Sequence, residues 1–327
     1  MKSCDRIMEK FRKKKIMVVG DFILDEYVYG ETERISREAP VLILRHNKSI
    51  YHAGGGANPV MNLKALGAEP VPVAAAGEEP QSDILVDMLK EKKVDVSHII
   101  RSAGYSMPVK ARIMAGSIHT VKQQIVRIDR YNENGLFKNV EQELINSIKV
   151  LAESMDTILV SDYGGGLVTD RIIKTINALA EKGKKIIVDS RYALRKFKNI
   201  AAATPNETEA GPIAGIEKYT DEDVAAIGKK LMKIMKARGM VITRGSRGMM
   251  VFSGNKTDRI EPFGSDEIVD VSGAGDTVSA ITALSLACGA SLKEAAFLAN
   301  VGGGIVVMKR GTATLSLKEL KKGVRNV

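Results

Sequence analysis

The sequence predicts an α/β protein with a doubly wound, mostly parallel sheet, helices on both faces and a small antiparallel β flap. Three observations lead to this fold class. Short, uninterrupted apolar runs alternate with longer amphipathic segments, as is typical of buried parallel strands covered by helices. Two segments break this alternation and look like antiparallel strands. With 327 residues, 44% of them apolar, the chain can bury a large core without disulfides.

The central strands and helices follow from this alternation, taken in chain order. The runs expected to form strands are 16–19, 157–160, 185–188 and 240–243. The expected helices are 57–66, 81–92, 139–154, 168–182, 220–237, 275–288 and 291–307. Right-handed crossovers between parallel strands give a layered sheet, and ligands of such sheets bind beyond the carboxyl ends of the strands. The residues that follow each strand are therefore the first candidates for a site.

The flap is predicted from residues 22–52 and 105–131, where apolar and polar residues alternate and helix signals are few. We expect these strands to cover the ligand end of the sheet as an insertion in one domain that spans 1–327. The alternative is that they only extend the central sheet. Exposed sheet faces and edges favour burial against another chain, so the flap also predicts a homodimer.

Composition excludes several classes of protein. The 49 basic and 39 acidic residues give a net charge of +10, which favours anionic partners. An aromatic content of 5% without tryptophan argues against base-stacking surfaces, so no nucleic-acid partner is expected. The first apolar run ends at Gly20, far short of the ~20 residues of a membrane span, and no signal peptide is predicted. The unpaired spacing of Cys4 and Cys288 favours a reducing, cytoplasmic location.

The glycine-rich segment 270–277, followed by an apolar run, carries the clearest chemical signal. Amides at a helix N-terminus are unpaired and attract anions. A carboxylate there would repel a phosphate, but Asp276 makes sense as the acceptor of a hydroxyl proton. The amides of Gly273, Ala274 and Gly275 would then neutralise the transferring group. The residues alone leave open the alternative that Asp276 only caps a helix.

This segment resembles the C-terminal signature of the ribokinase-like (PfkB) sugar kinases, and the resemblance extends from about Ile16 to Ser316. Residues 53–58 (AGGGAN) resemble the family's N-terminal glycine motif, which touches the sugar. Residues 204–209 (TPNETE) match its Asn-x-x-Glu element, and 243–248 (TRGSRG) match its nucleotide loop. Four ordered motifs at family-like spacing are far more specific than one glycine run.

Within this family the sequence is most similar to the heptose 7-phosphate kinases, the kinase half of bifunctional ADP-heptose synthesis proteins. Segments 19–27, 30–41, 58–63, 123–129 and 159–163 carry this similarity. The four histidines form no His-x-Gly-His element of a nucleotidyltransferase, so the resemblance implies a stand-alone kinase. Asp189-Ser190-Arg191 stands where the subgroup has Asp-Pro-Lys, which leaves the exact sugar open.

The resemblance implies ATP-dependent phosphoryl transfer to a sugar hydroxyl, with Mg²⁺ as cofactor and Asp276 as base. It places Thr243, Gly245 and Gly248 along the nucleotide. Asn206 and Glu209 would organise magnesium through water, because this ion dehydrates reluctantly. Asp270 and Ser272 resemble positions that help to bind a monovalent cation such as K⁺ in many relatives.

At the sugar end, the resemblance assigns Asp25, Gly55 and Asn58 to substrate hydroxyls. Turn formation is the alternative role of Asp25 and of the 54–56 glycines. Basic side chains would hold a substrate phosphate, and the candidates are Arg34, Lys110 and Arg112 in the flap and Arg191 after a strand. A solvated surface is the more common place for each of these four alone, but as a set they favour a phosphosugar over a free sugar. Asp162, with the 163–166 segment, could line the cleft or form a strand-to-helix turn, and the turn is favoured.

Other functions remain as alternatives at this point. The nearest is another PfkB-type kinase that acts on fructose, ribose or a fructose phosphate. A non-catalytic sugar-binding regulator on the same fold would lack the base, but Asp276 is present. A P-loop kinase needs Gly-x4-Gly-Lys-Ser/Thr, and a dinucleotide enzyme needs Gly-x-Gly-x-x-Gly after the first strand; the sequence contains neither pattern there.

Overall fold

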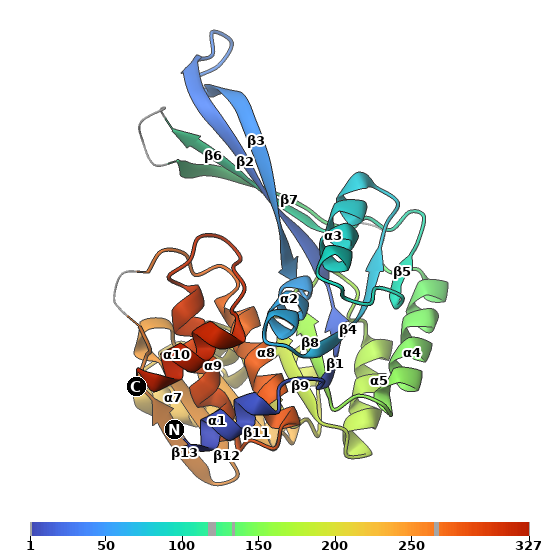
Figure 1. The fold of residues 1–327 in the computed structure, drawn as a ribbon, viewed down its shortest axis with the longest axis vertical. Coiled ribbons are helices and arrows are strands. Elements are labelled where there is room, and N and C mark those ends of the chain that lie inside the picture. The colour runs from blue at the N-terminus through green and yellow to red at the C-terminus, as the bar shows by residue number, and fades with distance from the viewer. Residues whose placement is uncertain (1, 117–121, 133–134, 265–267, 327) are drawn as a thin grey trace.

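A computed structural model of the chain describes residues 2–116, 122–132, 135–264 and 268–326. Its central sheet has seven parallel strands: β1 (Lys15–Gly20), β4 (Glu69–Ala76), β5 (Ile99–Arg101), β8 (Thr157–Asp162), β9 (Ile186–Ser190), β10 (Ala202–Ala203) and β11 (Gly239–Thr243). Two antiparallel strands, β12 (Met249–Ser253) and β13 (Lys256–Ile260), extend one edge. The spatial order is β13-β12-β11-β10-β9-β8-β1-β4-β5 (Figure 1).

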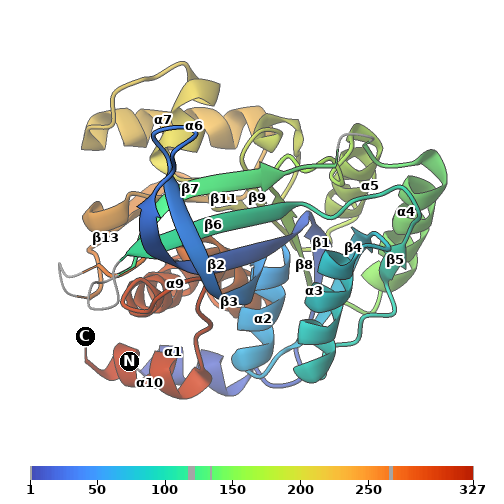
Figure 2. The same ribbon diagram turned by 90° about the horizontal axis from the view of Figure 1, so that it is seen from above.

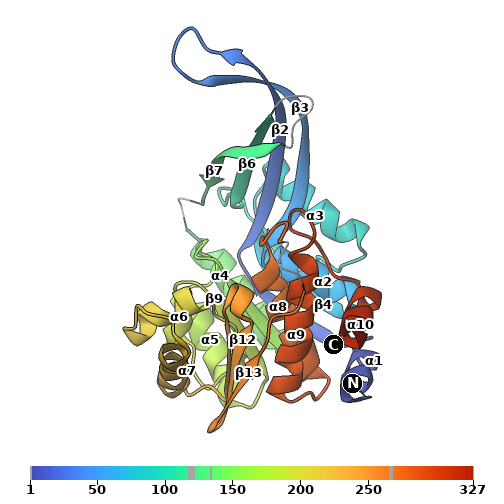
Figure 3. The ribbon, with the colours of Figure 1, turned by 90° about the vertical axis from the view of Figure 1, so that its left-hand side faces the viewer.

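Helices cover both faces of this sheet (Figure 3). One face carries α2 (Ala57–Ala65), α8 (Ala274–Ala287) and α9 (Leu292–Val306), and the other carries α4 (Lys138–Ala152), α5 (Asp170–Glu181) and α7 (Asp221–Met235). The remaining helices are α1 (Lys2–Glu9), α3 (Pro80–Glu91), α6 (Glu207–Ala214) and α10 (Leu317–Arg325). The terminal helices α1 and α10 lie side by side (Figures 1 and 2). The predicted doubly wound fold is confirmed.

The strands that the sequence predicts are those with continuous apolar runs. In β1 the side chains from Ile16 to Val19 are fully buried, because helices cover both faces of a parallel sheet. β4 carries Pro70 and Pro72 and is rich in alanine, residues that are depleted in strands, so its sequence alone does not predict it. Pairing with β1 and β5 on either side forms this strand.

The flap is a separate four-stranded sheet that rises from the carboxyl edge of the central sheet (Figure 1). Its strands are β2 (Phe22–Ile35), β3 (Leu42–Gly55), β6 (Val109–Gly116) and β7 (Gln123–Arg130), in the order β3-β2-β6-β7. Two antiparallel hairpins meet through a parallel pairing of β2 with β6. The flap prediction is therefore confirmed over simple extension of the central sheet, although 117–121 of the predicted 105–131 segment lie outside the described residues.

Two simple observations complete the fold. Among the described residues, no helix has the length and apolar character needed to cross a membrane. Cys4 and Cys288 are both buried free thiols.

Candidate active site

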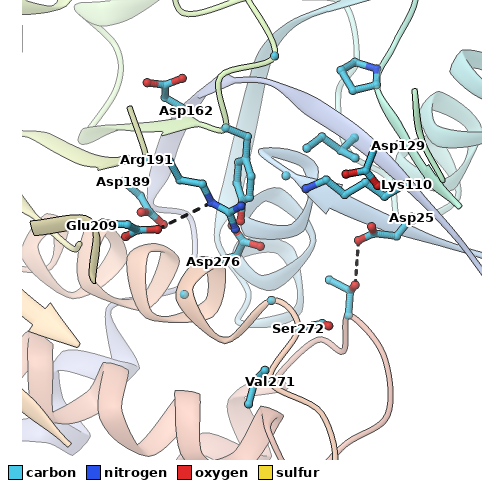
Figure 4. Close-up of a pocket in the computed structure, with 18 of the residues that line it drawn as sticks. Asp25, Lys110, Asp129, Asp162, Asp189, Arg191, Glu209, Val271, Ser272 and Asp276 are labelled. Carbon is cyan, nitrogen blue, oxygen red and sulfur yellow. Dashed lines mark hydrogen bonds and ion pairs between the residues drawn. The ribbon is translucent and has the colours of Figure 1, made fainter. Parts of the chain in front are cut away.

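A cleft of about 460 Å³ lies where the flap meets the carboxyl edge of the central sheet (Figure 4). It collects residues from the ends of β8, β9 and β11, from the segment before α8 and from the flap. The predicted site residues that line it are Asp25, Gly55, Lys110, Arg112, Asn206, Glu209, Thr243, Ser272, Gly273, Gly275 and Asp276. Motifs that are far apart in the sequence thus meet at the edge where the topology places a ligand.

Asp276 lies in the first turn of α8 at the bottom of this cleft and is only 3% exposed. The Tyr163 hydroxyl donates to its Oδ1 at 2.8 Å, and Asn58 Nδ2 donates to its Oδ2 at 3.0 Å. Burial raises the pKa of Asp276 to about 6, and these two hydrogen bonds oppose the rise. The residue at the N-cap position of α8 is Gly273, not Asp276, so the geometry does not support the capping alternative.

Asn58 has a different place from the one that the resemblance implies. Its side chain is buried, and Asn62 Nδ2 donates to its Oδ1 at 2.9 Å. The backbone amide of Leu315 donates to Asn62 Oδ1, so the orientation of both amides is fixed. Asn58 therefore holds the carboxylate of Asp276 from below, and its polar atoms are occupied by protein groups instead of facing a sugar.

The start of α8 is open to a ligand. Gly273 has φ of +78°, and a Cβ there would lie 2.4 Å from Asn58 Nδ2, so both conformation and space require glycine. A Cβ at Gly275 would meet no atom of the described residues within 4 Å. The amide of Ala274 donates to Val271 O at 3.3 Å, which engages it in the turn. Gly275 thus faces the open part of the predicted anion hole.

Asp25 lies within β2, so it does not form a turn as the alternative role would require. Arg112 Nη1 contacts its Oδ1 at 2.6 Å, and the Thr312 hydroxyl donates to its Oδ2 at 3.1 Å. A Cβ at Gly54 would lie 2.4 Å from Asp25 Oδ2, so the first glycine of the motif makes room for this carboxylate. Arg112 is thereby engaged in an ion pair at the flap end of the cleft.

The remaining predicted cations divide between the cleft and the surface. Lys110 Nζ lies 5.1 Å and Arg191 Cζ 4.4 Å from the centroid of the Tyr163 ring. Burial, followed by the charge of Arg191, lowers the pKa of Lys110. Arg34 is exposed on the distal part of β2, and the structure does not bring it to this cleft.

The cleft also contains residues that the sequence did not single out as catalytic or binding residues. Tyr163 follows β8, Asp189 is the last residue but one of β9, and Arg127 with its partner Asp129 comes from β7. Burial, followed by the charge of Asp276, raises the pKa of Asp189 well above its usual value. The sequence signal that could have found Tyr163 and Asp189 is their position just after the predicted strands. No such signal marks Arg127 and Asp129 in the flap. Asp162 accepts a bond from the Gly164 amide, as the turn interpretation expects, and it also lines the cleft.

At the other end of the cleft, Asn206 is the N-cap of α6 and forms a capping box with Glu209. Asn206 Oδ1 accepts the Glu209 amide at 2.8 Å, and Glu209 Oε2 accepts the Asn206 amide at 3.0 Å. The second oxygen of Glu209 lies 3.8 Å from Arg191 Nε. Within the described ranges no cluster of three or more His, Cys, Asp or Glu side chains could hold a metal directly. The donor set therefore fits a hydrated Mg²⁺ better than a fully protein-coordinated one.

The predicted nucleotide and cation residues come from two segments, 243–248 and 270–272. Thr243 lines the cleft at the end of β11. Gly245 and Gly248, with φ of +57° and +75°, shape the turn that follows but are not in the cleft wall. Asp270 Oδ1 accepts the Ser272 amide and its Oδ2 accepts the Gly311 amide, which ties the segment before α8 to the C-terminal part of the chain.

A buried carboxylate beside the open N-terminus of a helix, in the ligand crevice of a doubly wound sheet, is the arrangement of a small-molecule kinase. The model of the pfkB family carbohydrate kinases matches residues 13–319, so the chain belongs to this family. The protein is accordingly a carbohydrate kinase, and its family implies the use of ATP and Mg²⁺.

Curated relatives and solved structures agree with this assignment. The bifunctional protein HldE of Desulfatibacillum aliphaticivorans is 35% identical over 95% of this chain and 63% of its own length. HldE of Trichlorobacter lovleyi is 34% identical over 98% of the chain and 64% of its own length, so the chain spans less than two thirds of these relatives. Phosphofructokinase-2 of Escherichia coli in complex with potassium superposes with a TM-score of 0.78 at 19% identity, covering 96% of this chain and 99% of the other. Arabidopsis thaliana ribokinase complexed with ribose and ATP has a TM-score of 0.73 at 18% identity, with the same coverage.

Proposed function

We propose that this carbohydrate kinase phosphorylates heptose 7-phosphate to heptose 1,7-bisphosphate. The observation that carries the catalytic part is the position of Asp276, buried beside the open start of α8 with its pKa raised to about 6. The similarity to bifunctional HldE proteins over nearly the whole chain favours a heptose substrate.

The geometry of the cleft supports the following course for the reaction. Asp276 takes the proton of the acceptor hydroxyl as the sugar oxygen forms a bond to the terminal phosphorus of ATP. The bond from that phosphorus to the β–γ bridging oxygen breaks, and ADP leaves. The backbone around Gly273 and Gly275 stabilises charge on the transferring group through the partial positive charge of the helix end. Asn206 and Glu209 would hold Mg²⁺ through water, and the ion would supply neutralising charge. Thr243, Gly245 and Gly248 would border the nucleotide.

The charge of the flap side supports a phosphorylated substrate. Lys110 has no carboxylate partner within 4.0 Å among the residues that the structure describes, and Arg191 lies close enough to depress its pKa. Within the described residues, the one carboxylate within 4.0 Å of these two cations is Glu209, at 3.8 Å from Arg191, while Asp25, Asp129, Asp189 and Asp276 act on them from further away. Two neighbouring cations without a close ion pair favour binding of an anion between them. Arg112 supports Asp25 instead, because its guanidinium contacts that carboxylate.

A coupled ADP-release assay tests the substrate. The panel contains heptose 7-phosphate, fructose 1-phosphate, fructose 6-phosphate, ribose, fructose and adenosine. We expect the highest kcat/KM with heptose 7-phosphate, and Lys110→Met should raise KM for it at least tenfold while changing KM for ATP little. A higher kcat/KM for a fructose phosphate or for a free sugar would contradict the heptose assignment but leave the kinase activity in place.

Three further assignments belong to this proposal. The distal flap exposes Ile35, Val41 and Leu42, and β7 exposes Ile125, Val126 and Ile128, so we propose a homodimer through the flap. Sedimentation should show a dimer that Ile128→Lys dissociates.

Asp270 and Ser272 are proposed to border a K⁺ site, as the potassium complex of phosphofructokinase-2 suggests, and activity should then rise with K⁺ and not with Na⁺. The buried free thiols fit the predicted cytoplasmic location.

A further inference from the structure

We propose that Tyr163 is a positioning residue of the transfer site, whose hydroxyl holds Asp276 Oδ1 in place and lets that oxygen accept the substrate proton. This inference rests on the proposed role of Asp276 as base. It assigns a function to the residue that follows β8, which sequence reasoning placed in a turn.

The two partners of the Asp276 carboxylate are chemically different. Asn58 Nδ2 can only donate, and the bond from Asn62 to Asn58 Oδ1 prevents the amide from turning over. The Tyr163 hydroxyl donates to Oδ1 at 2.8 Å, but a hydroxyl can rotate and accept as well. When Asp276 becomes a carboxylic acid, only Tyr163 can change from donor to acceptor. The proton of the sugar hydroxyl therefore goes to Oδ1, and it passes to solvent after the products leave.

The backbone of Tyr163 and of the turn that follows it is held by the buried carboxylate of Asp21. Asp21 accepts the backbone amides of Tyr163, Gly165 and Leu167, each at 2.9 Å. A Cβ at Gly165 would lie 2.9 Å from Asp21 Cγ, so the glycine permits this close approach. The turn after β8 is thus held at three amides, and Tyr163 projects from it to the base.

The ring of Tyr163 also touches the substrate side of the cleft. Arg191 lies at 4.4 Å and Lys110 at 5.1 Å from its centroid, so the same side chain contacts Asp276 and both cations. Burial, followed by the negative charge of Asp276, raises the pKa of Tyr163 well above 10. The phenol therefore stays protonated and remains able to donate throughout the working pH range.

Tyr163→Phe removes the hydroxyl and keeps the ring with its two cation contacts. We expect kcat to fall about 10- to 100-fold with less than a threefold change in KM for either substrate, because a mispositioned base affects the transfer step. The hydroxyl lowers the pKa of Asp276, so its loss should move the acid limb of kcat/KM from near pH 6 upward by about one pH unit. The charged groups that face Asp276 are Asp25 from β2 and Asp189 and Arg191 from the end of β9; Tyr163→Phe leaves all of them in place.

Tyr105→Phe is the matched control. Tyr105 is a buried tyrosine outside the cleft, and its hydroxyl has no hydrogen-bond partner within the described part of the chain. We expect wild-type kcat and an unshifted acid limb for this variant. Wild-type kcat in Tyr163→Phe, or a lower kcat with an unshifted limb, would overturn the positioning role.

A second readout does not depend on turnover. Titration of the Asp276 carboxyl by ¹³C NMR should give a higher pKa in Tyr163→Phe than in the wild-type protein and no change in Tyr105→Phe. An equal Asp276 pKa in the wild type and Tyr163→Phe overturns the inference. If the wild-type protein phosphorylates no sugar of the panel, the proposed substrate fails, but this titration still decides whether Tyr163 acts on Asp276.

Discussion

Two helices, α6 and α8, begin at the same cleft, but their N-terminal starts are built in opposite ways. The start of α6 is closed by its own side chains, because Asn206 and Glu209 form a capping box. The start of α8 has Gly273 in a left-handed conformation and no side-chain cap among the described residues. Loss of a cap costs about 1 kcal/mol in helix stability, so an uncapped start is expected where a ligand takes the place of the cap.

The two helix starts also differ in the charged side chains around them. Glu207 at the start of α6 contacts Arg244 and Arg247, and Arg244 also contacts Asp221 at the start of α7. The charges of these ion pairs neutralise one another and hold the start of α6 against the start of α7. Asp276 is the charged residue in the first turn of α8, and it is buried and held by two neutral donors. The start of α6 is thus rigid and neutralised, whereas the uncapped start of α8 keeps the partial positive charge of a helix N-terminus.

The largest expected effect comes from removing the charge at α8. Asp276→Asn should lower kcat by about 10²- to 10⁴-fold, because the amide cannot accept the hydroxyl proton. Binding of ATP and sugar, measured by calorimetry, should stay within a few fold of the wild type. An equal loss of binding and turnover would argue that Asp276 organises the site and does not act as a base.

The same substitution has a predictable effect on stability. The pKa of Asp276 in the folded protein is about 6, above the ordinary 3.8, so its ionisation lowers the free energy of unfolding as the pH rises between these values. Asp276→Asn should therefore raise Tm at pH 8, and the gain should disappear below pH 4. Asp87→Asn, an exposed position in α3, is the control and should leave Tm nearly unchanged at both pH values.

The difference between the two helix starts was only partly predictable from the sequence. The glycines and Asp276 are adjacent in the chain, so local chemistry predicts an open helix start. The partners of Asp276 come from Tyr163 and Asn58, 113 and 218 residues away, and their contacts depend on strand order and helix packing. The family motif implies a sugar contact for Asn58, and the sequence alone does not reveal the contact of Asn58 with Asp276, because that contact depends on how the helices pack. The exposed place of Arg34 depends on how far the flap extends, which periodicity does not determine.

Substitutions of Gly273 and Gly275 at the start of α8 test two different requirements, a left-handed backbone conformation and open space for a ligand. Gly275→Ala adds a methyl group where the described residues leave open space, so the fold should be unaffected or stabilised by up to about 1 kcal/mol. The methyl group would occupy the anion hole, and we expect kcat to fall about 10- to 100-fold. Gly273→Ala should lose stability as well as activity, because its φ is +78° and Asn58 blocks the new atom. Urea unfolding and ADP release measure both quantities; wild-type activity in Gly275→Ala would contradict an anion hole at this position.

The smallest expected effect is at α6, and α7 offers a matched control. Asn206→Ala and Thr220→Ala each remove a capping box, so each should lower the free energy of unfolding by about 1 kcal/mol in urea titrations. Only Asn206 lines the cleft. If it holds the water shell of magnesium, Asn206→Ala should also raise the Mg²⁺ concentration for half-maximal activity several fold, while Thr220→Ala should not. Equal Mg²⁺ dependence in the two variants would leave Asn206 as a cap alone, and α6 would then contribute rigidity to the nucleotide end without taking part in metal binding.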